Sequence, residues 1–290
     1  MHKTLIGKEN YLFLINDSSN EIEKHCNNNS RGNIDLINLY NNYENFILIV
    51  YPDKSLIYQK YLPDNYKSLY RTILESYKNI LKDKILDPYD VLINEIDTYY
   101  KTDTHINLKG NYIVYNYFIN HINYKLKMDL PLLDINNLNK KLISSLSSLC
   151  LGIGDLTWES NLGNQKIDDM DDNYYSDNID EIKYNIHYIK KENIIKLIDD
   201  KNYLDHTDKN IGKLLNWEII SKYIIYRQNE NCNNNFKVII FYDSFMAFSL
   251  HLYMNLFKEI YFIKNIFDVN HINFIKPDYI FEFRVERFLF

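Results

Sequence analysis

Two short motifs of this chain contain the three residue types that serine hydrolases and acyltransferases use. One is Asp103-Thr104-His105, and the other is Asp243-Ser244-Phe245, which follows the apolar run at residues 238–242. A serine hydroxyl is a weak nucleophile until an imidazole takes its proton, and the imidazole needs a carboxylate that fixes its tautomer and stabilises its cation. Together the motifs indicate acyl transfer.

A parallel sheet could bring the two motifs together. Apolar runs at residues 46–50, 238–242 and 260–263 are typical of buried strands, and residues 278–283 are expected to form a last strand. Amphipathic stretches predict helices at residues 65–81, 108–126 and 244–257. Strands alternating with helices favour an α/β fold with a doubly wound parallel sheet. The weaker expectations are an edge strand at residues 11–15, a strand at 91–94, a helix at 143–149 and an acidic loop at 166–180.

Ser244 lies where a predicted buried strand ends and a helix begins. Its Oγ should therefore stand at the carboxyl edge of the sheet, where open α/β folds bind ligands. Backbone N–H groups in the first turn of that helix, including that of Ser244, could bind a developing oxyanion. Asp103 and His105 are two residues apart in a loop before the helix at 108–126, so both side chains can project to one side. His105 could then reach Ser244 while Asp103 holds the other ring nitrogen.

Composition excludes several classes of function. The net charge of −6 comes without a Lys/Arg block, so nucleic acid is a poor partner. The three cysteines lie far apart, the histidines show no metal-ligand spacing, and the acidic cluster at residues 168–172 lacks the order of a calcium loop. We therefore expect no metal and no cofactor.

No run approaches the roughly 18–20 apolar residues of a membrane span, and no signal peptide is recognisable. We expect a cytoplasmic enzyme, of an A+T-rich microbe or of a large DNA virus in its host's cytoplasm.

Six short motifs follow one another along the chain. In order they are Gly7 with Tyr11-Leu12-Phe13, Val50-Tyr51-Pro52-Asp53-Lys54, Tyr100 with Asp103-Thr104-His105 and Gly110, Gly154-Asp155-Leu156, Asp243-Ser244-Phe245, and Lys276-Pro277-Asp278 with Glu286-Arg287. In type and order they resemble the SGNH-hydrolase-like domains of the alginate O-acetyltransferases of the AlgX and AlgJ type. Each motif is weak alone, and the shared order over most of the chain makes the resemblance specific.

The resemblance implies a three-layer α/β/α, flavodoxin-like fold in circularly permuted order, with Asp and His before Ser. It implies one domain over residues 1–290, with an insertion or irregular part at about 130–235. The activity implied is O-acyl transfer, most simply O-acetyl transfer, to polysaccharide or glycan hydroxyls through an acyl-serine intermediate. Ser244 would be the nucleophile, His105 the general base and then acid, and Asp103 the orienting carboxylate.

Other residues of the motifs would support this site. The resemblance places five of them there, as oxyanion donors or supporting residues: Tyr100, Gly154, Asp155, Asp243 and Phe245. The implied partners are an acyl donor, a glycan acceptor and a membrane-bound protein that supplies the acyl group. Ile106 replaces the Trp that follows the family's His, and Met246 replaces a small residue after its D-S-F motif. These departures predict an altered acceptor surface.

Alternatives remain open at this point. The same triad would serve a carbohydrate esterase, because water and a sugar hydroxyl compete for one acyl-enzyme. A degenerate member of the family would bind glycans without catalysis. Asp103 and Asp243 are also favoured residues at helix N-termini, and Asp155 is a common turn former. Glu286 and Arg287 could pair with each other as scaffold at the end of the sheet.

Overall fold

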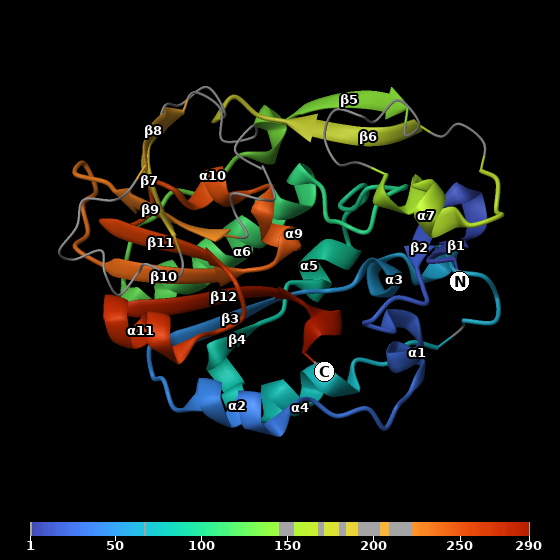
Figure 1. Ribbon diagram of the computed structural model, residues 1–290, viewed down its shortest axis with the longest axis horizontal. Helices are drawn as coiled ribbons and strands as arrows, with labels where there is room; N and C mark the ends of the chain where they lie inside the picture. The colour runs from blue at the N-terminus through green and yellow to red at the C-terminus, as the bar shows by residue number, and fades with distance from the viewer. Residues whose placement is uncertain are drawn as a thin grey trace. The chain divides into compact units, whose positions relative to one another are not determined.

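The computed structural model describes residues 2–66, 68–144, 154–167, 171–179, 184–190, 204–208 and 222–289 (Figure 1). The chain divides into two compact units. Unit 1 comprises Met1–Tyr40, Val50–Ser176 and Val285–Phe290, and unit 2 comprises Asn41–Ile49 and Asp177–Arg284. The single domain over residues 1–290, with an insertion at about 130–235, stays a prediction.

Unit 2 is built on a mixed β-sheet whose strands lie in the order β3-β12-β10-β11-β9-β7-β8. Their bounds are Phe46–Tyr51 for β3, which enters unit 1 at Val50, Tyr184–Lys190 for β7, Leu204–Asp208 for β8, Tyr223–Gln228 for β9, Lys237–Tyr242 for β10, Glu259–Lys264 for β11 and Tyr279–Val285 for β12. β10 pairs in parallel with both β11 and β12, and Figure 1 shows the three side by side. The predicted α/β fold is confirmed.

Three antiparallel strands extend this sheet beyond the prediction. β9 pairs antiparallel with β11 and with β7, and β7 pairs antiparallel with β8. They come from the part of the chain that was expected to be irregular. The central strands are easier to predict because Val238, Ile239, Ile240 and Phe241 are all 0% exposed, and burial on both faces requires a continuous apolar run.

The helices of unit 2 are short. They are α9 (Ser244–Ala247), α10 (Leu250–Tyr253) and α11 (Val269–Ile275). The helix predicted at residues 244–257 is therefore divided into α9 and α10. At the break, the backbone N–H and the hydroxyl of Ser249 both donate to the Met246 carbonyl, at 2.8 Å and 2.9 Å. A serine that bonds to nearby backbone in this way competes with the helical hydrogen bonds.

Unit 1 holds most of the helices. Its α-helices are α1 (Glu21–Cys26), α2 (Ile34–Asn41, whose last residue falls in unit 2), α3 (Lys54–Ile57), α4 (Thr72–Leu81), α5 (Tyr89–Ile93), α6 (Leu108–Leu126) and α7 (Glu159–Leu162). The short 3-10 helices are η1 (Lys8–Asn10), η2 (Gln59–Tyr61), η3 (Lys82–Lys84), η4 (Ile135–Asn137), η6 (Asp155–Thr157) and η10 (Glu286–Phe288). The bounds of α6 match the helix predicted at residues 108–126.

The strands of unit 1 are β1 (Thr4–Ile6), β2 (Leu12–Leu14), β4 (Ile85–Leu86), β5 (Asn139–Ser144) and β6 (Asp171–Ser176). β1 pairs with β2, and β5 with β6, both antiparallel. β2 thus confirms the strand expected at residues 11–15. Among the described residues, no helix is both long and apolar enough to cross a membrane.

Several local predictions need correction. Residues 91–94 form no strand, because residues 89–93 are the helix α5; a short apolar run does not distinguish the two. The helix expected at residues 65–81 begins only at Thr72. The acidic stretch at 166–180 contains β6, so it is not simply a loop. Of the helix expected at 143–149, the first two residues belong to β5, and residues 145–149 lie outside the described residues.

Candidate active site

Asp103 and His105 form a hydrogen-bonded pair in the loop before α6. Nδ1 of His105 lies 2.7 Å from Oδ1 of Asp103, and the same oxygen accepts the His105 backbone N–H at 2.8 Å. The Asp103 side chain is 1% exposed and that of His105 is 15% exposed. In the tautomer that donates from Nδ1 to Asp103, Nε2 carries the ring's lone pair. The loop therefore presents an imidazole whose tautomer is fixed by a buried carboxylate.

The backbone closes this loop on itself. Tyr99 and Ile106 form an isolated β-bridge, and the Tyr100 N–H donates to the His105 carbonyl at 3.2 Å. Asn107 then caps α6, because its side chain accepts the Gly110 N–H at 3.0 Å. A Cβ on Gly110 would collide with the Thr98 carbonyl and with the Ile106 side chain. This close approach explains why the motif contains glycine.

A second segment, which contains Gly154 and Asp155, forms hydrogen bonds with the same loop. The Asp155 backbone N–H donates to Oδ2 of Asp103 at 3.0 Å. The Asp155 carboxylate accepts the Thr104 N–H at 2.9 Å and the Thr104 hydroxyl at 2.8 Å. Gly154 has a φ of +84°, which lies in the left-handed region that glycine adopts without strain. Asp155 therefore binds Asp103 directly, and the supporting role of Gly154 and Asp155 in catalysis stays a prediction.

Burial and charge shift the pKa values of this group. Burial alone would raise the pKa of Asp103, but the charge of His105 and the hydrogen bonds from His105 and Asp155 lower it. Burial alone would lower the pKa of His105, but the charge and hydrogen bond of Asp103, helped by the charge of Asp155, raise it. Burial and the charge of Asp103 raise the pKa of Asp155 to about 6. The pair thus favours the imidazolium, the state that forms when His105 takes a proton.

Asp172 also holds the loop, and the sequence did not single it out for this role. Its Oδ2 accepts the Thr102 N–H at 2.8 Å and the Thr102 hydroxyl at 2.9 Å. Asp172 is 3% exposed, so it is a buried residue of β6 and not part of the acidic loop expected at residues 166–180. The two partners are 70 positions apart, and no spacing rule in the sequence connects them.

Ser244 is the first residue of α9 and follows directly on β10, as the sequence predicts. Asp243 precedes it as the N-terminal cap, and its carboxylate accepts the Phe245 N–H at 2.9 Å. Ser244 is half-buried, whereas Phe245 and Met246 are fully buried. The bond to Asp243 occupies the Phe245 N–H, which the sequence offered as an oxyanion donor. The burial of Met246 and of Ile106 also removes both from an acceptor surface.

The predicted site residues fall into two groups. Asp103, His105 and Asp155 belong to unit 1, and Ser244 belongs to unit 2. The structure brings the first three together, and the completion of the triad by Ser244 stays a prediction. One ligand atom from each of the three lies within 4.8 Å of the others, so they could also hold a metal ion. The sequence expectation of no metal site likewise stays a prediction.

Glu286 and Arg287 do not pair with each other, contrary to expectation. Nη2 of Arg71 lies 2.6 Å from the Glu286 carboxylate. Nη1 of Arg287 lies 3.1 Å from the Glu21 carboxylate and 2.7 Å from that of Asp53. Adjacent residues in a turn of 3-10 helix point in different directions, so each meets its own partners in unit 1.

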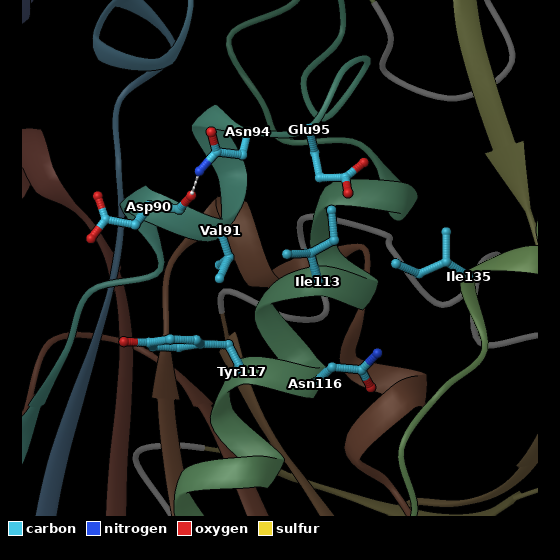
Figure 2. A pocket seen from close by; sticks show the side chains of 8 residues that line it. All are labelled: Asp90, Val91, Asn94, Glu95, Ile113, Asn116, Tyr117 and Ile135. Atoms are coloured by element: carbon cyan, nitrogen blue, oxygen red, sulfur yellow. Dashed lines mark hydrogen bonds between the residues drawn. The ribbon is translucent and has the colours of Figure 1, made fainter.

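Figure 2 shows a pocket of about 410 Å³ elsewhere in unit 1, along α5 and α6. Its lining residues are Asp90, Val91, Asn94, Glu95, Ile113, Asn116, Tyr117 and Ile135. Several polar groups there already have protein partners: Asn116 bonds to the backbone of Leu133 at both ends of its amide, and Glu95 accepts from Lys109 at 3.2 Å. None of the predicted site residues lines this pocket.

Comparison with known proteins identifies the fold. No protein-family profile matches the sequence, and no curated protein matches it significantly. Two structures of Bacillus cereus PatB1, one with a sulfonyl adduct, align with TM-scores of 0.64 at 16% and 18% identity; they cover 99–100% of this chain and 96–97% of PatB1. A DHHW family protein from Eubacterium siraeum aligns with a TM-score of 0.56 at 14% identity, over 99% of this chain and 94% of its own. The O-acetyltransferase domain of Pseudomonas putida AlgJ aligns at 10% identity with a TM-score of 0.47, over 100% and 92%.

The likeness to PatB1 and to the DHHW protein spans the whole length of each chain. This chain therefore has the fold of those proteins, and the α/β fold expected from its sequence is confirmed.

Proposed function

We propose that the protein is a serine O-acyltransferase that transfers an acetyl group to hydroxyl groups of a glycan. The observation that carries the proposal is the buried pair in which His105 Nδ1 lies 2.7 Å from Asp103 Oδ1. An imidazole held in this way is a general base for a serine hydroxyl. Ser244, at the β10–α9 junction, is the nucleophile assigned to it.

The reaction proceeds in two steps. Nε2 of His105 takes the Ser244 hydroxyl proton while Oγ bonds to the acyl carbon of the donor, and the donor's leaving oxygen departs with that proton. A glycan hydroxyl then bonds to the acyl carbon, His105 takes its proton, and the Ser244–acyl bond breaks as Oγ regains a proton. The charge of Asp103 stabilises the imidazolium in both steps.

The first test is chemical capture of the nucleophile. One PatB1 structure carries a sulfonyl adduct, and sulfonyl fluorides react with activated nucleophilic side chains. We expect phenylmethylsulfonyl fluoride to add one sulfonyl group at Ser244, detected by peptide mass spectrometry. Ser244→Ala should lose this label and the hydrolysis of 4-nitrophenyl acetate while keeping the wild-type circular dichroism spectrum. Retained turnover in that variant would remove Ser244 from the mechanism.

Product analysis separates transfer from hydrolysis. The unlabelled wild-type enzyme is incubated with 4-nitrophenyl acetate, with and without an acetyl-free oligosaccharide. Acetylated oligosaccharide supports the transferase, whereas acetate as the sole product in both reactions indicates an esterase. If the protein is neither labelled at Ser244 nor active on the ester, the result indicates a glycan-binding protein without catalysis.

A further inference from the structure

Lys54, in the first turn of α3, is buried in unit 1 beneath the Asp103–His105 loop. Its side chain is enclosed so fully that the residue is 3% exposed. Nζ donates to the backbone carbonyls of Leu12 at 2.6 Å, Lys101 at 2.8 Å and Asp103 at 2.9 Å. An ammonium has three N–H donors, so all three are engaged, and all three go to carbonyls rather than to a carboxylate.

These carbonyls belong to two distant segments. Leu12 lies in β2, whereas Lys101 and Asp103 lie in the loop, and the Leu12 N–H also donates to the Lys101 carbonyl at 3.0 Å. The Phe13 ring, 5.5 Å from Nζ, offers its face to the cation. A single ammonium therefore joins the loop to the β1–β2 hairpin.

We propose that Lys54 is a positioning residue of the catalytic loop: its ammonium holds the backbone at Lys101 and Asp103 and so fixes the Asp103–His105 pair. The inference rests on the proposed function. Burying a cation is unfavourable unless its hydrogen bonds compensate, and an apolar side chain would fill the same space without that penalty. Removing the ammonium would leave buried carbonyls unsatisfied, and the loop would relax toward other donors.

Protonation of Lys54 gives this inference a measurable signature. Burial lowers the pKa of Lys54 to about 8, although the charges of Asp172 in β6, Asp103 in the loop, Asp155 in η6 and Glu21 in α1 oppose the shift. The neutral amine has only two N–H donors, so one carbonyl loses its bond above that pH.

Deprotonation of Lys54 weakens the hold on the loop, but it increases the stability of the folded protein. With a folded pKa of about 8 and an ordinary value of 10.5, the unfolded chain binds more protons between these pH values. Lys54 therefore raises the free energy of unfolding as the pH rises through this window. Loop positioning is lost over the same range, so an effect on His105 cannot arise from general destabilisation by this group.

The experiment compares the wild type with Lys54→Met, Lys54→Arg and the control Lys78→Met, whose residue pairs with Asp87 at the surface of α4. We expect K54M to lose about 100-fold in kcat for 4-nitrophenyl acetate, the typical effect of a misplacement of about 1 Å, with KM within about threefold of the wild type. K78M should stay within about twofold of the wild type. K54M that is folded and has kcat within threefold of the wild type would overturn the proposal.

Nuclear magnetic resonance gives a readout that needs no turnover. The ring carbon Cε1 of His105, assigned by its absence in His105→Gln, should show a second titration step near pH 8 in the wild type and none in K54R, which stays charged. If K54M does not fold, this comparison decides alone, and the absence of the step in the wild type would overturn the proposal. If the wild type shows the step but no turnover, the positioning role stands and the acyltransferase proposal fails.

Discussion

Two histidine–aspartate pairs lie in unit 1, and they are held in different ways. In one pair, His25 Nε2 lies 3.0 Å from Asp53 Oδ2, and its Nδ1 lies 3.1 Å from the Tyr70 carbonyl. The other oxygen of Asp53 binds Arg287 at 2.7 Å. Both ring nitrogens and both carboxylate oxygens are thus hydrogen-bonded to other groups of the protein, and the His25 side chain is 1% exposed.

The other pair is His105 with Asp103. The second oxygen of Asp103 accepts the backbone N–H of Asp155, which is a neutral donor rather than a guanidinium. Asp103 therefore keeps its charge for the imidazole, and the His105 side chain is more exposed, at 15%. The comparison shows that a hydrogen bond between a histidine and an aspartate does not by itself make the two residues catalytic. What neutralises the carboxylate, and how exposed the imidazole is, separate a structural pair from a reactive one.

The largest difference between the pairs should appear when each aspartate is changed to asparagine. Asp103→Asn should lower kcat about 10³- to 10⁴-fold, because an amide neither fixes the base tautomer of His105 nor stabilises its cation. The fold should persist, since Asn can still accept the Asp155 N–H. The measurement is kcat for 4-nitrophenyl acetate with circular dichroism as the control. A loss in kcat of less than tenfold would show that Asp103 is not required for catalysis and that the two pairs do not differ in this way.

Asp53→Asn should have its main effect on stability. It leaves the buried charge of His25 without its carboxylate and removes one of the two carboxylates that bind Arg287, a change expected to lower the free energy of unfolding by about 3–5 kcal/mol. Urea denaturation at pH 7 measures this loss. The folded fraction should keep kcat within about threefold of the wild type. Destabilisation below about 1 kcal/mol, or a kcat loss like that of D103N, would show that the two pairs are not distinct in role.

The sequence predicts a helix or strand well when the pattern lies within that segment, and poorly when the element depends on contacts with distant segments. The runs at residues 46–50 and 238–242 reveal their strands because burial on both faces requires every residue to be apolar. Residues 91–94 gave the wrong element because a run of only three apolar residues fits a helix equally well. The strands β7, β8 and β9 pair antiparallel through long-range contacts that leave little local pattern.

The site residues also separate into those that a local sequence pattern predicts and those that depend on distant partners. Asp103 and His105 were predictable because their types and spacing carry the chemistry, and Asp155 followed from the order of motifs. Asp172 was missed because its partner Thr102 is 70 positions away. The role of Lys54 was also missed, although its motif was noticed, because its partners are backbone carbonyls and any residue type supplies those.

The remaining prediction sharpens the comparison through pH. Burial alone would lower the pKa of His25, but the hydrogen bond and charge of Asp53, with the charges of Glu286 and Glu21, raise it from 6.5 to about 9. The folded state therefore binds more protons between these values. The stabilisation from His25 is complete below about pH 6.5 and is lost as the pH rises through 9.

His25→Gln removes this titration while keeping a group that can hydrogen-bond to Asp53. The difference in unfolding free energy between wild type and H25Q should therefore shrink by roughly 3 kcal/mol from pH 6 to pH 9.5. Taking the difference between the two proteins cancels the opposite slope from Lys54. A difference that does not change with pH would mean that His25 is uncharged in the fold. The contrast with His105 would then rest on hydrogen bonding alone, because the charge that His25 carries below about pH 9 is what marks its pair as a fixed part of the scaffold.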